Sequence, residues 1–235
     1  ENEPESGYRS KFSHQEENAS PGYYRVFLED YRIDAALTVT RRCGFHQYTF
    51  PAAKEANIII DLKESVVSEE ILDLTIQILT DHEISGYRKS SGWAADQSVY
   101  FYAIFSRSFD SYGTATDGEI SENSNMASGK DVQAYVKYST QENEKILVKV
   151  GISGVSVEGA RKNLIAELPG WDFNKIRRAA EDEWIQKLSR IEVNGGSQDD
   201  QKKFYTALYH CYLAPNLFSD DDGQYRGNDG KVYEV

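Results

Sequence analysis

The residues best placed to do chemistry form a polar run near the end of the chain, at positions 219–230. The run is rich in aspartate and glycine and includes Arg226 and Asp229. A carboxylate accepts hydrogen bonds and a guanidinium donates several, so such a loop can surround a polar ligand. A solvated surface loop has the same composition. On the residues alone, both interpretations stay open.

Three consecutive aspartates, Asp220 to Asp222, raise the question of a calcium site. The run continues into Gly223 but lacks the alternating ligands and the closing glutamate of a twelve-residue calcium loop. We therefore assign no metal-binding residue from the sequence. The two cysteines, Cys43 and Cys211, are too few for a disulfide framework, and we predict two buried free thiols.

A helix must lead into the polar run. Ser197 is a suitable N-cap, and two carboxylates follow it in the first turn, where the helix dipole favours them. Phe204 and Leu208 begin an apolar face at helical spacing, and Pro215 ends the pattern. Tyrosines at neighbouring positions widen that face. We therefore expect the helix to be buried on more than one side, with His210 buried and hydrogen-bonded.

Upstream of this helix, residues 23–152 show many short runs of alternating apolar and polar residues separated by turn signals. This pattern is typical of an antiparallel β-sandwich. The most aromatic strand is predicted at 99–106. A β-branched run at 58–60 predicts a strand buried on both faces. The glycine- and serine-rich stretch at 112–129 predicts either a long loop or a ragged hairpin.

Two further helices connect the strands to the last helix. One is predicted at 156–168, and Asp172 caps the other. The fold class is therefore mainly β with C-terminal helices. We expect a β-sandwich domain at 1–168, a helical linker at 169–196 and the start of a second, helical domain at 197–235.

Composition narrows the choice of partners. The net charge is −12, with 38 acidic against 26 basic residues. This balance argues against a nucleic-acid partner, whose binding needs a basic surface, and against an anionic membrane. No apolar run approaches the roughly 20 residues that span a bilayer. Trp93 precedes a strand and is either a sugar-stacking platform or a core or interface aromatic.

Four blocks in chain order resemble glycoside hydrolase family 92, the calcium-dependent, exo-acting α-mannosidases. The likeness spans nearly the whole chain. The blocks are FSHQEENASPGYY at 12–24, RCGFHQYTFP at 42–51, GISGVSVEGARKNL at 151–164, and the final run from Phe204 to Gly230 with its YH, LAPN and YRGNDG segments.

The resemblance implies an N-terminal β-sandwich, a helical linker and a catalytic α/α barrel, with the active site between sandwich and barrel. It implies mannose-containing glycans as substrate, a periplasmic or extracellular bacterial enzyme, and calcium as cofactor. Inverting hydrolysis needs two carboxyl groups spaced to admit a water molecule. In this family the acid, the base and the calcium ligands come from the barrel beyond Val235. We therefore assign no catalytic residue, and expect the barrel portion of the same polypeptide as a partner.

Two substrate-binding residues follow from the resemblance. Asp229 is expected to contact hydroxyl groups of the terminal mannose, because a carboxylate accepts hydrogen bonds from neighbouring hydroxyls. The alternative is that Asp229 holds a turn together with Gly230. Arg226 is expected either to orient that carboxylate or meet the sugar, or to form a structural ion pair.

Two other functions compete with the mannosidase hypothesis. One is a free-standing, non-catalytic carbohydrate-binding β-sandwich, and the other is a structural or interaction domain. The helical tail argues against the first, because a binding module has no use for a barrel helix that ends in an unpaired loop.

Overall fold

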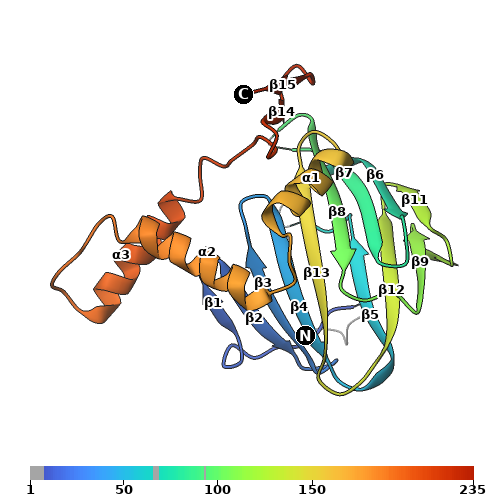
Figure 1. Cartoon of the computed structure of the whole chain (residues 1–235), viewed down its shortest axis with the longest axis horizontal. Helices are drawn as coiled ribbons and strands as arrows, with labels where there is room; N and C mark the ends of the chain where they lie inside the picture. The colour runs from blue at the N-terminus through green and yellow to red at the C-terminus, as the bar shows by residue number, and fades with distance from the viewer. Residues whose placement is uncertain (1–7, 66–68, 93) are drawn as a thin grey trace.

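The computed structural model describes residues 8–65, 69–92 and 94–235. Two β-sheets pack face to face, and three helices follow them, of which the first two lie on the outer face of the larger sheet (Figure 1). A small hairpin ends the chain. The prediction of a mainly antiparallel β-sandwich followed by helices is confirmed. The domain boundaries at 168 and 196 stay a prediction.

The larger sheet has nine strands in the order β1-β2-β3-β4-β13-β8-β7-β6-β11. Neighbouring strands along the chain pair as hairpins, and β13 returns between β4 and β8. In chain order the strands are β1 (Asn18–Ser20), β2 (Tyr23–Leu28), β3 (Ile33–Val39), β4 (Cys43–Phe50), β6 (Glu70–Ile78), β7 (Glu83–Ser91), β8 (Gln97–Phe105), β11 (Met126–Gly129) and β13 (Glu144–Ser153).

The smaller sheet has four strands in the order β10-β9-β12-β5. They are β5 (Ala53–Asp61), β9 (Ser111–Thr116), β10 (Glu119–Glu122) and β12 (Val132–Thr140). The stretch at 112–129 therefore contains a hairpin, β9 with β10, and then a short strand, β11, that joins the edge of the larger sheet. Of the two predictions for this stretch, the hairpin is the one the structure shows.

Alternation along the strands builds two apolar layers. On β8, Ala103 and Phe105 face the core between the sheets, whereas Tyr102 faces the layer beneath the helices. On β6, Leu74 and Ile76 are fully buried in the core between the sheets. Because successive side chains of a strand point to opposite faces, the two layers follow directly from the sequence pattern.

The prediction that the run at 58–60 lies in a strand buried on both faces is wrong. Ile59 is 41% exposed, while Ala56 on the opposite face is buried. The reason is that β5 belongs to the smaller sheet, and only one face of that strand packs against the larger sheet. A β-branched run reports strand propensity and not how many faces are covered.

The helices are α1 (Val157–Glu167), α2 (Phe173–Leu188) and α3 (Gln198–Cys211), with Ser156, Asp172 and Ser197 as their N-caps. The side chain of each cap accepts a hydrogen bond from a backbone N–H of the first turn. Helix α1 packs on β13 and β8, and α2 lies across β2, β3 and β4. Ala160 and Leu164 of α1 are buried in this outer layer together with Phe45.

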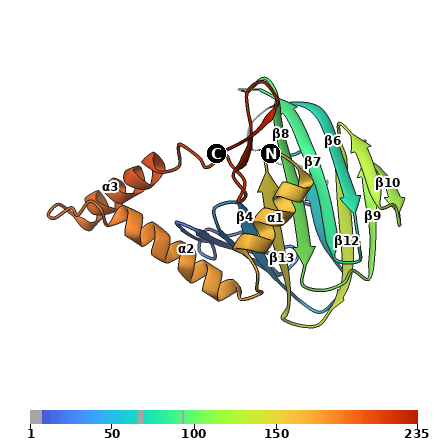
Figure 2. The same cartoon turned by 45° about the horizontal axis from the view of Figure 1, so that its top comes forward.

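The prediction that α3 is buried on more than one side is also wrong. No residue of α3, which the structure describes completely, is buried, and His210 and Cys211 are exposed. The helix contacts α2 through Tyr209, whose ring centre lies 4.7 Å from that of Trp184. Both views place α3 away from the sheets (Figures 1 and 2). A single neighbouring helix covers only one side of it.

Candidate functional site

The two predicted substrate-binding residues lie in a hairpin of two short antiparallel strands, β14 (Gln224–Arg226) and β15 (Val232–Glu234). The hairpin stands at one end of the sandwich, beside the segment that joins β13 to α1 (Figures 1 and 2). Its turn is closed by a hydrogen bond from the N–H of Gly230 to the carbonyl of Gly227. Gly230 has φ +78, a conformation that favours glycine.

Asp229 occupies this turn with an accessible carboxylate. Its Oδ1 accepts a hydrogen bond from the N–H of Lys231 at 3.1 Å, and its Oδ2 accepts one from the Tyr233 hydroxyl at 2.8 Å. These hydrogen bonds, that from Tyr233 first, hold the pKa of Asp229 below its usual value. Asp229 therefore does hold the turn. An ionised carboxylate has about four acceptor positions, so it also retains room for sugar hydroxyls.

Arg226 fixes the hairpin to the sandwich through backbone carbonyls. Its Nε donates to Gly154 at 2.9 Å and its Nη2 to Val155 at 2.8 Å. Its Nη1 donates to the carbonyl of Gly230 at 3.0 Å, inside the turn. The guanidinium thus bridges the β13–α1 segment and the turn that carries Asp229. It positions the backbone around Asp229 and leaves the carboxylate free.

The aspartate run joins the sandwich to the hairpin. Asp220 is 4% exposed and accepts hydrogen bonds from Ser153 and Asn163. Asp222 pairs with Lys162 at 2.9 Å. Within the described residues, no group of three or more His, Cys, Asp or Glu side chains is arranged to hold a metal ion. The described residues therefore offer no ready-made set of acidic, histidine or cysteine ligands for calcium.

The contacts of Asp220 were not predicted from the sequence. Ser153 and Asn163 both belong to the family-like block at 151–164, and Asp220 belongs to the final block. Membership in these blocks was the only sequence signal that the three residues have a function. Their separations of 67 and 57 positions gave no indication that they meet.

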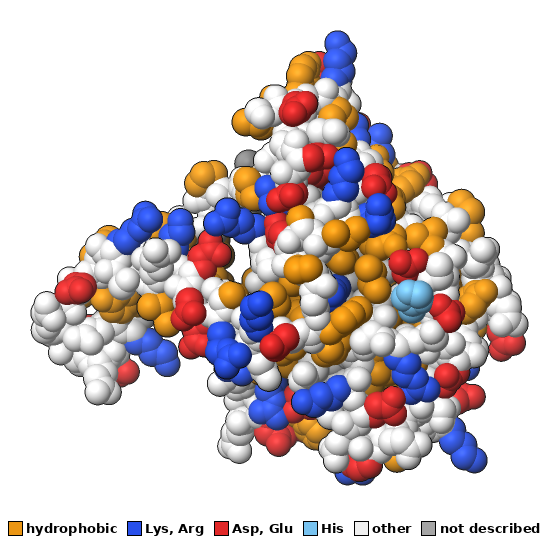
Figure 3. Space-filling view, viewed as in Figure 1, with side chains coloured by type: hydrophobic (Ala, Val, Ile, Leu, Met, Phe, Trp, Pro, Cys, Tyr) orange, Lys and Arg blue, Asp and Glu red, His pale blue; other side chains and the backbone are white. Residues whose placement is uncertain are grey.

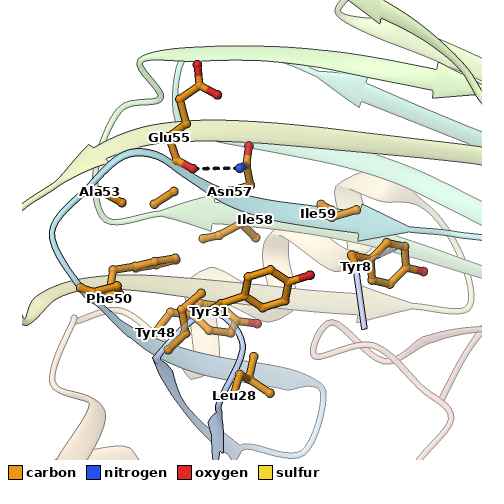
Figure 4. Close-up of a pocket in the computed structure, with 13 residues that line it drawn as sticks. Tyr8, Leu28, Tyr31, Tyr48, Phe50, Ala53, Glu55, Asn57, Ile58 and Ile59 are labelled. Atoms are coloured by element: carbon orange, nitrogen blue, oxygen red, sulfur yellow. Dashed lines mark hydrogen bonds between the residues drawn. The ribbon is translucent and has the colours of Figure 1, made fainter. Parts of the chain in front are cut away.

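A separate pocket of about 660 Å³ opens between β5 and strands β3 and β4. Tyr31, Tyr48 and Phe50 line it with aromatic rings, and the carboxylate of Glu55 points away from them (Figure 4). Among the described residues that line it, Glu55 is the one acidic side chain. The described lining therefore does not supply the pair of carboxyl groups that glycoside hydrolysis requires.

Two further histidines are His46 on β4 and His14, which precedes β1. His46 packs edge-on against Tyr48 and shares a hydrogen bond of 3.0 Å with its hydroxyl. Burial lowers the pKa of His46 to about 4. His14 is at the surface, 2.6 Å from Glu17. Trp93, the predicted stacking platform or core aromatic, lies outside the described residues.

Charge is spread over the surface. On the face seen in Figure 3, acidic and basic side chains are interspersed, with apolar groups between them. None of the helices in the described part of the chain combines the length and the apolar character needed to cross a bilayer.

Comparison with known proteins assigns both parts of the chain. Residues 1–153 match the glycosyl hydrolase family 92 N-terminal domain, and residues 159–235 match the glycosyl hydrolase family 92 catalytic domain. An uncharacterized secreted glycosidase of Arthroderma benhamiae is 26% identical over 87% of this chain and 29% of its own length.

Two solved structures from Bacteroides thetaiotaomicron are similar throughout. A family GH92 α-mannosidase is 34% identical, with a TM-score of 0.92 over 97% of this chain and 32% of its own. A family GH92 inverting mannosidase is 26% identical, with a TM-score of 0.87 over 96% of this chain and 30% of its own. The chain thus spans about a third of the length of these relatives. With its sandwich matched to one family domain and its helices and hairpin to the other, the chain belongs to glycosyl hydrolase family 92.

Proposed function

We propose that this chain is the sandwich, the linker and the first barrel helix of an exo-acting, calcium-dependent, inverting α-mannosidase. The complete enzyme removes terminal mannose from glycans. We place it in the periplasm or outside the cell. The relative described as a secreted glycosidase supports export, although it does not distinguish between these two locations.

The observation that carries this proposal is the likeness to the family GH92 α-mannosidase over 97% of the chain, at 34% identity and a TM-score of 0.92. The same kind of enzyme has also been solved in complex with mannoimidazole, and that structure matches with a TM-score of 0.91. The relative described as an inverting mannosidase supports the stereochemical outcome.

In the proposed enzyme, this chain binds and positions the sugar and does not break the bond. Asp229 accepts hydrogen bonds from hydroxyls of the terminal mannose, while Arg226 holds the turn beneath it. The catalytic acid and base come from the remainder of the barrel, as do the calcium ligands. Calcium bound there would supply a fixed positive charge to the site.

The apolar face of α3 suits this proposal. Phe204 and Leu208 are only half-buried in this chain, and Cys211 on the same face is exposed. Burial of such a face against further helices of the same polypeptide is favourable in proportion to the apolar area removed from water. The alternative of a non-catalytic binding module is disfavoured, because residues 159–235 match a catalytic domain.

The direct test is hydrolysis of an aryl α-mannoside by the complete enzyme. We expect activity that a calcium chelator removes and that added calcium restores. NMR of the first product formed should show β-mannose, the mark of inversion. A linear mannan chain should release only single mannose units.

Each part of the proposal has its own contradicting result. First-formed α-mannose would exclude inversion, and release of longer fragments would exclude exo action. Full activity after chelation, with residual calcium checked by elemental analysis, would exclude the cofactor. The 235-residue chain alone provides the matched control, since we expect it to be inactive.

A further inference from the structure

The path of the chain after α3 shows what holds the hairpin in place. All residues from 211 to 218 are exposed, and burial resumes at Ser219 and Asp220. Helix α3 therefore does not position the hairpin through packing of the segment between them. The hairpin is held where residues 219–226, which we call the strap, meet the sandwich.

The deepest contact of the strap is the carboxylate of Asp220. Ser153, at the end of β13, donates its hydroxyl to Oδ2 at 2.6 Å, and the Asn163 amide on α1 donates to Oδ1 at 2.9 Å. Asn163 is fully buried and also accepts the N–H of Asp221 at 2.7 Å. Hydrogen bonds that involve an ionised, buried acceptor are stronger than neutral ones. This carboxylate therefore joins strand, helix and strap.

A second contact comes from Arg42, in the turn between β3 and β4. Its Nε donates to the carbonyl of Ser219 at 2.7 Å, and its Nη1 pairs with Glu167 at 2.7 Å. Glu167 is held in turn by the hydroxyl of Thr40 and the N–H of Arg42. Arg42 also donates from Nη2 to the carbonyl of Asp220 at 3.3 Å, and its Nη1 lies 3.7 Å from the carboxylate of Asp221. It therefore holds the strap through two backbone oxygens and one side chain.

Asp220 also sets the conformation that leads into β14. Its N–H donates to the carbonyl of Gln224 at 2.7 Å, and its own carbonyl accepts the N–H of Gly223 at 3.0 Å. A tight turn therefore runs from Asp220 into the first strand of the hairpin. This turn therefore couples the position of Asp220 to the start of that strand, whose other end is held on the sandwich by Arg226.

The space for Asp220 depends on Gly159 of α1. A Cβ atom at this position would lie 2.7 Å from Oγ of Ser153 and even closer to Oδ2 of Asp220. Alanine is otherwise preferred over glycine inside a helix by about 1 kcal/mol. Glycine here therefore gives up helix stability in exchange for room for the buried carboxylate.

We propose that Asp220 is a positioning residue of the sugar site. Held by Ser153 and Asn163, it locks the strap onto the sandwich and so fixes where Asp229 stands. The first part concerns this chain alone. The second part, that Asp220 acts on the substrate through Asp229, rests on the proposed function.

Hydrogen–deuterium exchange of the 235-residue chain tests the first part. Gly159→Ala and Asp220→Asn should each speed exchange at residues 224–234 by roughly 10- to 100-fold. This factor is the one expected from the loss of one charge-assisted hydrogen bond. The sandwich peptides report whether the fold is kept. Gly170→Ala meets no atom within 4 Å, so it should leave the hairpin unchanged. Asp222→Asn loses the charge that pairs with Lys162 but keeps an oxygen for the N–H of Gln224, so it should change exchange less than Asp220→Asn does.

Two outcomes decide this part. Faster exchange confined to the strap and hairpin supports the proposal that Asp220 holds the strap on the sandwich. Unchanged exchange in Gly159→Ala overturns it. Because Gly159→Ala removes no charge and favours the helix, it remains decisive even if Asp220→Asn fails to fold.

A double-mutant cycle in the complete enzyme tests the second part. Gly159→Ala should lower kcat/KM for an aryl α-mannoside by about tenfold or more. Added to Asp229→Ala it should cost little further, because both changes remove the same interaction. Additive losses would mean that Asp220 does not act through Asp229. A parent enzyme without mannosidase activity would instead overturn the proposed function and leave the exchange result standing.

Discussion

The ammonium group of Lys149 donates to the backbone carbonyl of Leu168 at 2.8 Å, beneath the linker between α1 and α2. Lys149 is 4% exposed, and its Nζ lies 4.0 Å from the ring centre of Trp171. Burial lowers the pKa of this lysine. A charged group is therefore kept in an apolar layer by the carbonyl that caps α1 and by an aromatic face.

Replacing this lysine should destabilise the fold. In Lys149→Met the carbonyl of Leu168 loses its donor in a buried site, so the free energy of unfolding should fall by about 1–3 kcal/mol. Urea unfolding measures this change. Lys145→Met, at an exposed position of the same strand, should stay within about 0.5 kcal/mol of the parent. An equally stable or more stable Lys149→Met protein would show that the cost of burying the charge outweighs the bond.

The stability of the sandwich should fall in mild acid because of His46. Its pKa is about 4 in the folded chain, against an ordinary value of about 6.5. Between these values the unfolded state binds more protons, so stability is lost as the pH falls from 6.5 to 4. The whole pKa difference would correspond to a loss of roughly 3 kcal/mol in the free energy of unfolding. We expect a smaller loss, because His46 is half-buried and not fully enclosed.

The His46 contribution can be separated from that of the carboxylates. Urea unfolding at pH 7 and pH 4.5 should show a smaller loss for His46→Gln than for the parent, since carboxylate protonation affects both alike. Equal losses in the two proteins would show that His46 is not the group responsible.

Asp229 can be tested for two roles at once. In the complete enzyme Asp229→Ala should lower kcat/KM by about 10- to 100-fold with the fold intact, the usual effect of losing a hydrogen bond to a charged group. Asp229→Asn keeps an oxygen that can accept the N–H of Lys231, so the turn survives while the charge is lost.

Comparison of the two variants separates the roles. If Asp229 contacts the sugar as a carboxylate, both should be impaired. Restored activity in Asp229→Asn would mean that the turn is all that matters. Tyr233→Phe removes a hydrogen bond to Asp229 but keeps its charge, and should have the smallest effect.

The two thiols should react differently. Cys43 is buried, and burial raises its pKa to about 12, so it should be inert, whereas Cys211 is exposed. A thiol reagent should therefore label one cysteine in the native 235-residue chain and two after denaturation. In the complete enzyme we expect Cys211 to be protected by neighbouring barrel helices. Rapid labelling there would contradict the proposed packing of α3.

The sequence alone determined the local structure of this protein. The alternation of apolar and polar residues in β6 and β8 specifies strands, because backbone geometry fixes which side chains share a face. Polar N-cap residues specify where the helices begin, at Ser156, Asp172 and Ser197. The identity of the family-like blocks specified the family. None of this requires knowledge of how distant segments meet.

Only the tertiary structure determined which side chains are exposed and which distant residues contact one another. Ile59 is exposed because it lies on the face of β5 that does not pack against the larger sheet, and α3 is uncovered because only α2 packs against it. Asp220 is buried because Ser153 and Asn163, 67 and 57 positions away, converge on it. Burial and hydrogen bonding across such separations depend on the path of the whole chain, which a local pattern of residues does not encode.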